Sequence, residues 1–249
     1  MNSSTSASVD PSEVEQFSAL AAEWWDPKGP FEQLHQFNPI RVGCIRDQVC
    51  AALGRDALTP APLGGLAIAD VGCGGGLLCE PLARLGANVT GVDPSEKNIA
   101  CASLHAEQMA LDINFQQSTV EDIAASGAQF DAVLAMEVLE HVADIPSFME
   151  ACSAILKPGG IFIGATLNRT LKSLALAKVG VEYILRWLPV GTHDWDKFIT
   201  PAELTRALRD AGLPLDQIQG ATYNPINGVW QLSEDTDINY MVVAQKPAA

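Results

Sequence analysis

A glycine-rich turn and a later acidic residue have the types and spacing that hold a nucleoside-bearing ligand. The segment from Asp70 to Gly76 reads DVGCGGG, follows a short apolar run and precedes a helix-like stretch. Glycines let the backbone turn sharply and let a ligand approach the main chain closely. Asp93 ends the next apolar run, and an acid at the end of a second strand reaches ribose hydroxyls. We therefore predict that Gly72, Gly74, Gly76 and Asp93 bind a cofactor.

The spacing within this turn separates two kinds of cofactor. Dinucleotide-binding folds use G-x-G-x-x-G, but Leu77 stands where their last glycine would be, which leaves G-x-G-x-G. The departure disfavours a NAD-binding oxidoreductase, which stays an alternative. For the glycine segment, a plain strand-to-helix turn is a second alternative. For Asp93 the alternative is a helix cap, because Pro94 follows it and Asp-Pro is typical of a cap, a role that is compatible with ribose binding.

A second cluster of reactive side chains lies in the run EVLEH. On a helix Glu137, Glu140 and His141 share one face. Two carboxylates and an imidazole there can hold a divalent ion, Mg²⁺ or similar, whereas His141 alone can act as a general base. We predict metal binding by these three residues, with Glu140 and His141 in catalysis. His193, in the run GTHD, is a second candidate base, although both runs also fit purely structural turns.

The elements that must position these residues alternate between strands and helices, which predicts βαβ units and a parallel sheet with helices on both faces. Helices are expected before this core over 13–25 and 39–53, and after it over 200–210. The predicted sheet has seven mostly parallel strands, one of them an antiparallel edge strand. The expected strands span 66–71, 88–93, 113–117, 130–136, 160–167, 215–219 and 238–245.

The same pattern predicts how the chain is divided. We expect a disordered tail over 1–12 and a single α/β domain over 13–249. The domain would consist of an N-terminal helical cap, a cofactor-binding core, a lid insert where the alternation stops, and a C-terminal helix with strands. These parts span 13–58, 66–167, 168–198 and 199–249.

Charge and the amino-terminal segment limit the partners and the location. The chain has 15 Lys and Arg against 30 Asp and Glu, and its net charge of −15 repels phosphate backbones. We therefore expect no nucleic-acid binding. No apolar run reaches the ~18–20 residues of a membrane-spanning helix, and residues 1–12 lack the parts of a targeting signal. These features predict a cytoplasmic protein with free thiols.

The order of motifs resembles the class I S-adenosylmethionine-dependent methyltransferases: a strand, G-x-G-x-G, a helix, a strand ending in Asp93, and a later strand beginning at KPGG. This resemblance implies a Rossmann-like fold and S-adenosylmethionine as cofactor. It places the glycine turn around the methionine moiety and Asp93 on the ribose. Met136 matches the position whose backbone lies beside the cofactor, and Glu121 and Asp122 lie where the adenine is usually met.

Segments outside the core carry a narrower resemblance, to the ubiquinone-biosynthesis O-methyltransferases, from about residue 13. It implies O-methylation of catechol hydroxyls on polyprenylated benzene rings, cofactor contact by Arg41, divalent-metal use, and membership of a quinone-biosynthesis complex. A methyltransferase for another small aromatic or lipid, and a non-catalytic scaffold, remain alternatives. The segments include Trp24-Trp25-Asp26, Asn38-Pro39, Thr166-Leu-Asn168, Glu182-Tyr183, Thr192-His193-Asp194, Tyr223-Asn224-Pro225 and Asn239-Tyr240-Met241.

The insert has a composition of its own. Residues 168–188 carry four basic residues and a single acid, among many leucines and with Tyr183 and Trp187. An apolar helix with basic flanks and aromatic residues can lie in a lipid interface. We therefore predict peripheral membrane contact through 168–188, where a lipid-tailed substrate would be met. A lid packed on its own core is the alternative.

Overall fold

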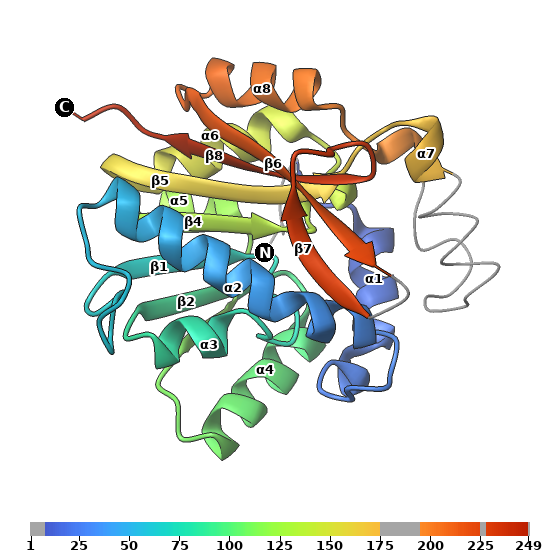
Figure 1. Ribbon diagram of the computed structural model, residues 1–249. Helices are drawn as coiled ribbons and strands as arrows, with labels where there is room; N and C mark the ends of the chain where they lie inside the picture. Colours follow the sequence, from blue (N-terminus) through green and yellow to red (C-terminus); the bar gives the residue numbers. More distant parts are fainter. Residues whose placement is uncertain (1–7, 175–194, 225–227, 249) are drawn as a thin grey trace.

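The computed structural model describes residues 8–174, 195–224 and 228–248, and these form one twisted sheet flanked by helices (Figure 1). The described strands number eight, in the order β3-β2-β1-β4-β5-β8-β6-β7. They are β1 Ala67–Val71, β2 Asn88–Asp93, β3 Asn114–Gln117, β4 Phe130–Met136, β5 Leu156–Leu167, β6 Leu215–Asn224, β7 Val229–Ser233 and β8 Asn239–Gln245.

The predicted α/β architecture is confirmed, with one strand more than expected. β1 to β5 are mutually parallel, whereas β8 runs antiparallel between β5 and β6. The antiparallel edge strand is β7, which pairs with β6 from Gly220↔Ser233 to Asn224↔Val229. We did not predict β7, because its five residues, VWQLS, mix polar and apolar types with no clear period.

Helices cover both faces of the sheet. They are α1 Pro11–Ala19, η1 Ala21–Glu23, α2 Glu32–Ala52, α3 Cys79–Arg84, α4 Glu96–Gln108, α5 Val120–Ala125, η2 Leu139–His141, α6 Ile145–Ala154, α7 Leu171–Ser173, η4 Trp195–Lys197 and α8 Pro201–Asp210, the η elements being 3₁₀ turns. One apolar core lies under α5, α6 and α8, and includes Ile123, Phe148 and Leu204. A second lies under α2 and α3, and includes Ile45 and Leu82.

Several helix boundaries differ from the prediction. α2 begins at Glu32, and Pro39 lies inside it, although proline favours the first helical position because it lacks an N–H donor. The first helix is shorter than predicted, because Asp10 caps it at Ser12 N and it gives way to a 3₁₀ turn after Ala19. α5 was not predicted, although Thr119 caps it through Asp122 N.

The predicted disordered tail is partly ordered in the structure. Ser8 is buried and Val9 forms a bridge with Val142, so residues 8–12 of the predicted tail pack on the domain. Residues 1–7 lie outside the described part of the chain, as do 175–194, which hold most of the insert. Among the residues that the structure describes, no helix has the length and apolar character needed to cross a membrane.

Candidate active site

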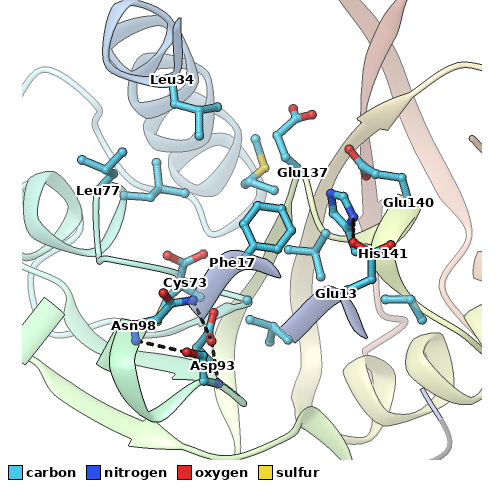
Figure 2. A pocket seen from close by; sticks show the side chains of 18 of the residues that line it. Glu13, Phe17, Leu34, Cys73, Leu77, Asp93, Asn98, Glu137, Glu140 and His141 are labelled. Atoms are coloured by element: carbon cyan, nitrogen blue, oxygen red, sulfur yellow. Dashed lines mark hydrogen bonds and ion pairs between the residues drawn. The ribbon is translucent and has the colours of Figure 1, made fainter. Parts of the chain in front are cut away.

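A cavity of about 700 Å³ opens at the carboxyl ends of β1, β2 and β4. Figure 2 shows Asp93 and Asn98 at one side of it, His141 and Glu13 at the other, and Phe17 of α1 between them. The wall contains most of the predicted site, namely Arg41, Gly72, Asp93, Glu121, Met136, Glu137, Glu140 and His141. Gly74, Gly76 and Asp122 are not part of the wall, and His193 lies outside the described residues.

The glycine turn is held by the end of the second strand. Gly72 N and Cys73 N both donate to the carbonyl of Val92, at 2.7 and 3.0 Å. Gly72 has φ +71° and Gly74 has φ +52°, a region that favours glycine. A Cβ on Gly72 would lie 2.5 Å from the Val138 side chain. The turn therefore depends on glycine both for its backbone conformation and for its packing.

Asp93 ties the two halves of the predicted cofactor site together. Its Oδ2 accepts from Gly74 N at 3.0 Å, and its Oδ1 accepts from Ser95 N at 2.9 Å and from Asn98 Nδ2 at 3.2 Å (Figure 2). Burial raises the pKa of Asp93, and the donated hydrogen bonds oppose that rise. The cap of α4 is Ser95, so the reading of Asp93 as a helix cap is wrong.

The N-terminal cap packs directly on the glycine turn. Trp24 is buried, stacks on Phe31 with a centroid distance of 3.8 Å, and donates from Nε1 to Asn98 Oδ1 at 3.0 Å. Trp25 Nε1 donates to the carbonyl of Gly75 at 3.0 Å. A Cβ on Gly75 would lie 2.4 Å from Trp24 Cβ. The cap therefore closes the cofactor side of the cavity.

Arg41 is a buried cation on α2 with unused hydrogen-bonding capacity. Its Nη2 donates to Asn38 Oδ1 at 2.9 Å, and its guanidinium carbon lies 5.5 Å from the centre of the Phe37 ring. Burial lowers its pKa, and the charges of Glu137 and Asp70 oppose that shift. Its Nε is buried without a hydrogen-bond partner. A buried guanidinium with a free donor suits a ligand carboxylate.

The EVLEH run does not form the predicted α-helical face. Leu139–His141 is a 3₁₀ turn, and Glu137 has φ +59°. Glu140 Oε2 accepts from Thr166 Oγ1 at 2.8 Å. Burial, and then the neighbouring charge of Glu140, raise the pKa of Glu137 to about 8. The two carboxylates thus lie close together next to the strand ends.

His141 faces a partner that the sequence did not reveal. Its Nδ1 lies 3.0 Å from Glu13 Oε2, and the ring meets Phe17 edge-on at 5.0 Å between centroids. Lys197 Nζ donates to Glu13 Oε1 at 2.7 Å and to Asp10 Oδ2 at 3.0 Å. Burial lowers the pKa of His141, but the hydrogen bond to Glu13 and the charges of Glu140, Glu13 and Glu137 together outweigh burial, so the pKa is raised.

The predicted metal set is not assembled. No group of three or more His, Cys, Asp or Glu side chains is placed to hold a metal ion in the part of the chain that the structure describes. His141 turns its Nδ1 to Glu13, and Glu140 Oε2 accepts from Thr166. His141 Nε2 and the second Glu140 oxygen keep their lone pairs, and a carboxylate on the far nitrogen is common for histidines that bind metals. Metal binding by Glu137, Glu140 and His141 therefore stays a prediction.

The two acidic residues of α5 differ in their surroundings. Glu121 faces the cavity and accepts a hydrogen bond from the Ser8 hydroxyl. Asp122 lies outside it, where its Oδ2 accepts from Thr119 Oγ1 at 3.0 Å. Asp122 therefore belongs to the helix cap, and only Glu121 lies where a cofactor would be met.

Comparisons with known proteins agree with this geometry. Residues 69–164 match the family model described as a methyltransferase domain. The chain is 52% identical to the ubiquinone biosynthesis O-methyltransferase of Methylobacterium nodulans over 249 residues, which is all of both chains. It is also 52% identical over 248 residues to the enzyme of that name from Brucella anthropi. The chain belongs to the ubiquinone biosynthesis O-methyltransferase family.

Solved structures show the same fold at low identity. The magnesium protoporphyrin IX methyltransferase of Synechocystis PCC 6803, with bound SAH, aligns with TM-score 0.61 and 22% identity, over 93% of this chain and 94% of that one. A possible histamine N-methyltransferase from Thermotoga maritima aligns with TM-score 0.62 and 18% identity, over 94% and 99%. The predicted class I methyltransferase fold and the S-adenosylmethionine-dependent O-methyltransferase class are confirmed, which rules out the oxidoreductase alternative.

Proposed function

We propose that this protein methylates a catechol hydroxyl on a polyprenylated benzene intermediate of ubiquinone biosynthesis. The observation that carries the proposal is the 52% identity, over the full length of both chains, to a relative named ubiquinone biosynthesis O-methyltransferase. The cavity supports it, because one space joins a nucleoside-binding turn to a histidine that can accept a proton. A methyltransferase for another small aromatic or lipid is the competing function.

The cofactor side of the cavity is built to hold S-adenosylmethionine. After accepting from Gly74, Ser95 and Asn98, the Asp93 carboxylate has one lone-pair site left, on Oδ2, for a ribose hydroxyl. The unpartnered Nε of Arg41 matches the amino-acid carboxylate. Gly72, Glu121 and Met136 complete this part of the wall. When bound, the cofactor supplies a sulfonium methyl group to an oxygen held in line with it.

His141 is placed to accept the hydroxyl proton. A phenolic hydroxyl has a pKa near ~10, so it needs help to ionise at neutral pH. With Nδ1–H donating to Glu13, the basic nitrogen is Nε2, which Figure 2 shows on the side of Phe17 and Glu137. Holding both reactants in one cavity supplies up to ~7–11 kcal/mol of barrier reduction. Removal of the hydroxyl proton by His141 then makes the oxygen nucleophilic enough to accept the methyl group.

Labelled cofactor with a short-chain prenyl catechol tests the activity. We expect the label in an O-methyl product, and a His141→Ala loss in kcat of ~10²–10⁴-fold. Labelling of soluble aromatics or other lipids, but not of prenyl catechols, would establish the competing function.

Metal assistance by Glu137, Glu140 and His141 is the alternative to base catalysis. The three side chains line the same cavity, and exhaustive chelation distinguishes the two mechanisms. Turnover that survives chelation would establish base catalysis by His141 without an ion. Loss of turnover that added Mg²⁺ restores would establish the metal and displace His141 as the base.

Contact with a membrane surface and with a quinone-biosynthesis complex belongs to the same proposal. A polyprenyl chain gains ~0.8 kcal/mol per buried CH₂ in a bilayer, so an enzyme acting on its head group benefits from reaching the interface. Leu171, in the described part of the insert, is 79% exposed. Lys178, Arg186 and Trp187 lie outside the described residues. We propose a peripherally bound cytoplasmic enzyme.

A further inference from the structure

A second stretch of the cavity wall is aromatic and comes from α2 and the β6–β7 hairpin. Gln33, Phe37 and Arg41 are spaced by four residues on α2, so they share one face of the helix. All three line the cavity, together with Tyr223 of β6 and Trp230 of β7. Figure 1 shows β7 beside the N-terminal half of α2, and the two elements are in contact.

The aromatic rings of this wall pack on one another. The Phe37 and Trp230 rings lie 4.5 Å apart between centroids, tilted by 30°, and the Tyr223 and Trp230 rings lie 5.3 Å apart. Phe37 is buried. Flat apolar surfaces of this kind bind other aromatic rings by offset or edge contacts. The wall therefore suits a planar, carbon-rich ligand.

Besides Arg41 Nε, two polar atoms of this wall are buried without a hydrogen-bond partner among the described residues. They are Trp230 Nε1 and Gln33 Oε1, and both residues face the cavity. Buried polar atoms in folded proteins almost always have a hydrogen-bond partner. An indole N–H can only donate, and an amide oxygen can only accept. A ligand that carries an oxygen acceptor and a hydroxyl donor on one ring would satisfy both.

We propose that Trp230 and Gln33 form the subsite that recognises the oxygenated ring of the methyl acceptor. The ring packs on the Phe37–Trp230 wall, Trp230 Nε1 donates to a ring oxygen, and Gln33 Oε1 accepts from a ring hydroxyl. The ligand class is an aromatic ring with neighbouring oxygen substituents. This inference rests on the proposed function and adds the residues that select its substrate.

The first test removes the indole donor and keeps an aromatic ring. Trp230→Phe should raise KM for a short-chain prenyl catechol ~3- to 10-fold, the effect of one hydrogen bond. The affinity for S-adenosylhomocysteine and the melting temperature should not fall, because Nε1 has no protein partner to lose. Trp195→Phe is the matched control, since Trp195 Nε1 donates to the carbonyl of Thr170 at 3.1 Å. It should lower the melting temperature and leave KM unchanged.

The second test identifies the oxygen. Acceptors that lack one ring oxygen at a time are compared on the wild type and on Trp230→Phe. We expect the penalty of the substitution to vanish for one of these analogues, because its partner is then already missing. Gln33→Met should show the same behaviour with an analogue lacking a different, hydroxyl oxygen. An unchanged KM in Trp230→Phe, or one penalty common to every analogue, would overturn the subsite.

The subsite and the proposed function fail in different ways. If the wild type does not methylate prenyl catechols, the proposed function is wrong. Calorimetry of the same catechols with enzyme loaded with S-adenosylhomocysteine then decides the subsite separately. Weaker binding by Trp230→Phe than by the wild type supports it, and equal or undetectable binding by both overturns it.

Discussion

At the scale of single residues, the orientation of His141 depends on the carboxylate of Glu13, which lies 128 residues earlier in the chain. Glu13 holds the His141 Nδ1, and Lys197 in turn holds Glu13. A carboxylate at Nδ1 fixes the tautomer that leaves Nε2 as the basic nitrogen. Lys197 lies at the end of the predicted insert, 168–198, so the end of that segment contacts the proposed catalytic histidine through one residue, Glu13.

Glu13→Gln is therefore expected to lower kcat about tenfold, with little change in KM, because an amide binds Nδ1 without fixing one tautomer. Steady-state kinetics with both substrates measures the split between kcat and KM. Asp10→Asn is the matched control, since Asp10 also binds Lys197 but does not contact His141. Equal kcat losses in the two variants would mean that the ion pairs act only by holding α1 in place.

Asp70 makes the stability of the unliganded protein depend on pH. Burial raises its pKa to about 6 from the usual 3.8, against the hydrogen bond from Cys79 and the charge of Arg41. A raised carboxyl pKa means that folding takes up a proton, so this contribution to stability is lost as pH rises through 6.

Asp70→Asn removes this titration. The stability of the variant relative to the wild type should rise from pH 4 to pH 7.5, by at most about 3 kcal/mol in total, with roughly half of the rise above pH 5. Denaturant unfolding of the unliganded proteins at several pH values measures the difference. A difference that stays constant over this range would show that Asp70 titrates at its usual pKa.

At the scale of elements, the N-terminal cap and the glycine turn form one unit. Trp24 covers Gly74 and Gly75 and is bonded to Asn98, which also binds Asp93. A displacement of the cap would therefore also disturb Asp93, through the Trp24–Asn98 and Asn98–Asp93 hydrogen bonds. The turn is thus shaped by a segment about fifty residues before it as well as by its own glycines.

Gly75→Ala tests this unit without adding a charge or a strained φ. Its Cβ would meet Trp24, so we expect weaker S-adenosylhomocysteine binding in calorimetry and a stability loss of ~1–3 kcal/mol. Gly43→Ala is the matched control, because nothing lies within 4 Å of that position on α2. It should bind normally and be up to ~1 kcal/mol more stable. Normal binding by Gly75→Ala would show that the cap is dispensable for the cofactor.

At the scale of the whole molecule, the charge of the insert is partly neutralised by the chain itself. Lys172 pairs with Asp235 and Asp237, and Arg169 pairs with Glu203. These cations are therefore less available to anionic lipids than the sequence suggests. Apolar contact by the insert is left as the main source of the proposed membrane affinity.

Vesicle co-sedimentation tests this proposal. Leu171→Glu combined with Leu185→Glu and Trp187→Glu should abolish sedimentation with vesicles of mixed neutral and anionic lipids, because charges oppose interfacial insertion. Leu58→Glu is the matched control, since Leu58 is 90% exposed on a loop after α2. Sedimentation that survives the triple variant would exclude the insert as the anchor.

Local sequence patterns were sufficient to predict seven of the eight described strands, the glycine turn and Asp93. Each of these depends on neighbouring residues: apolar runs predict strands, and a positive φ favours glycine. The same local reasoning placed Glu137, Glu140 and His141 correctly at the end of β4, but it assumed an α-helix where the chain forms a 3₁₀ turn. Metal binding by these three residues stays a prediction.

Which side chains of the site contact one another depends on how the elements pack in the folded chain. Glu13 lies 128 residues from His141, and Trp230 contacts Phe37 across two elements far apart in the sequence. No local pattern encodes such pairs, because packing of α1, α2 and the β6–β7 hairpin on the sheet brings them together. The glycine turn and Asp93 can therefore be recognised in a short segment of sequence. The surroundings of the proposed base and the acceptor subsite form only when the chain folds.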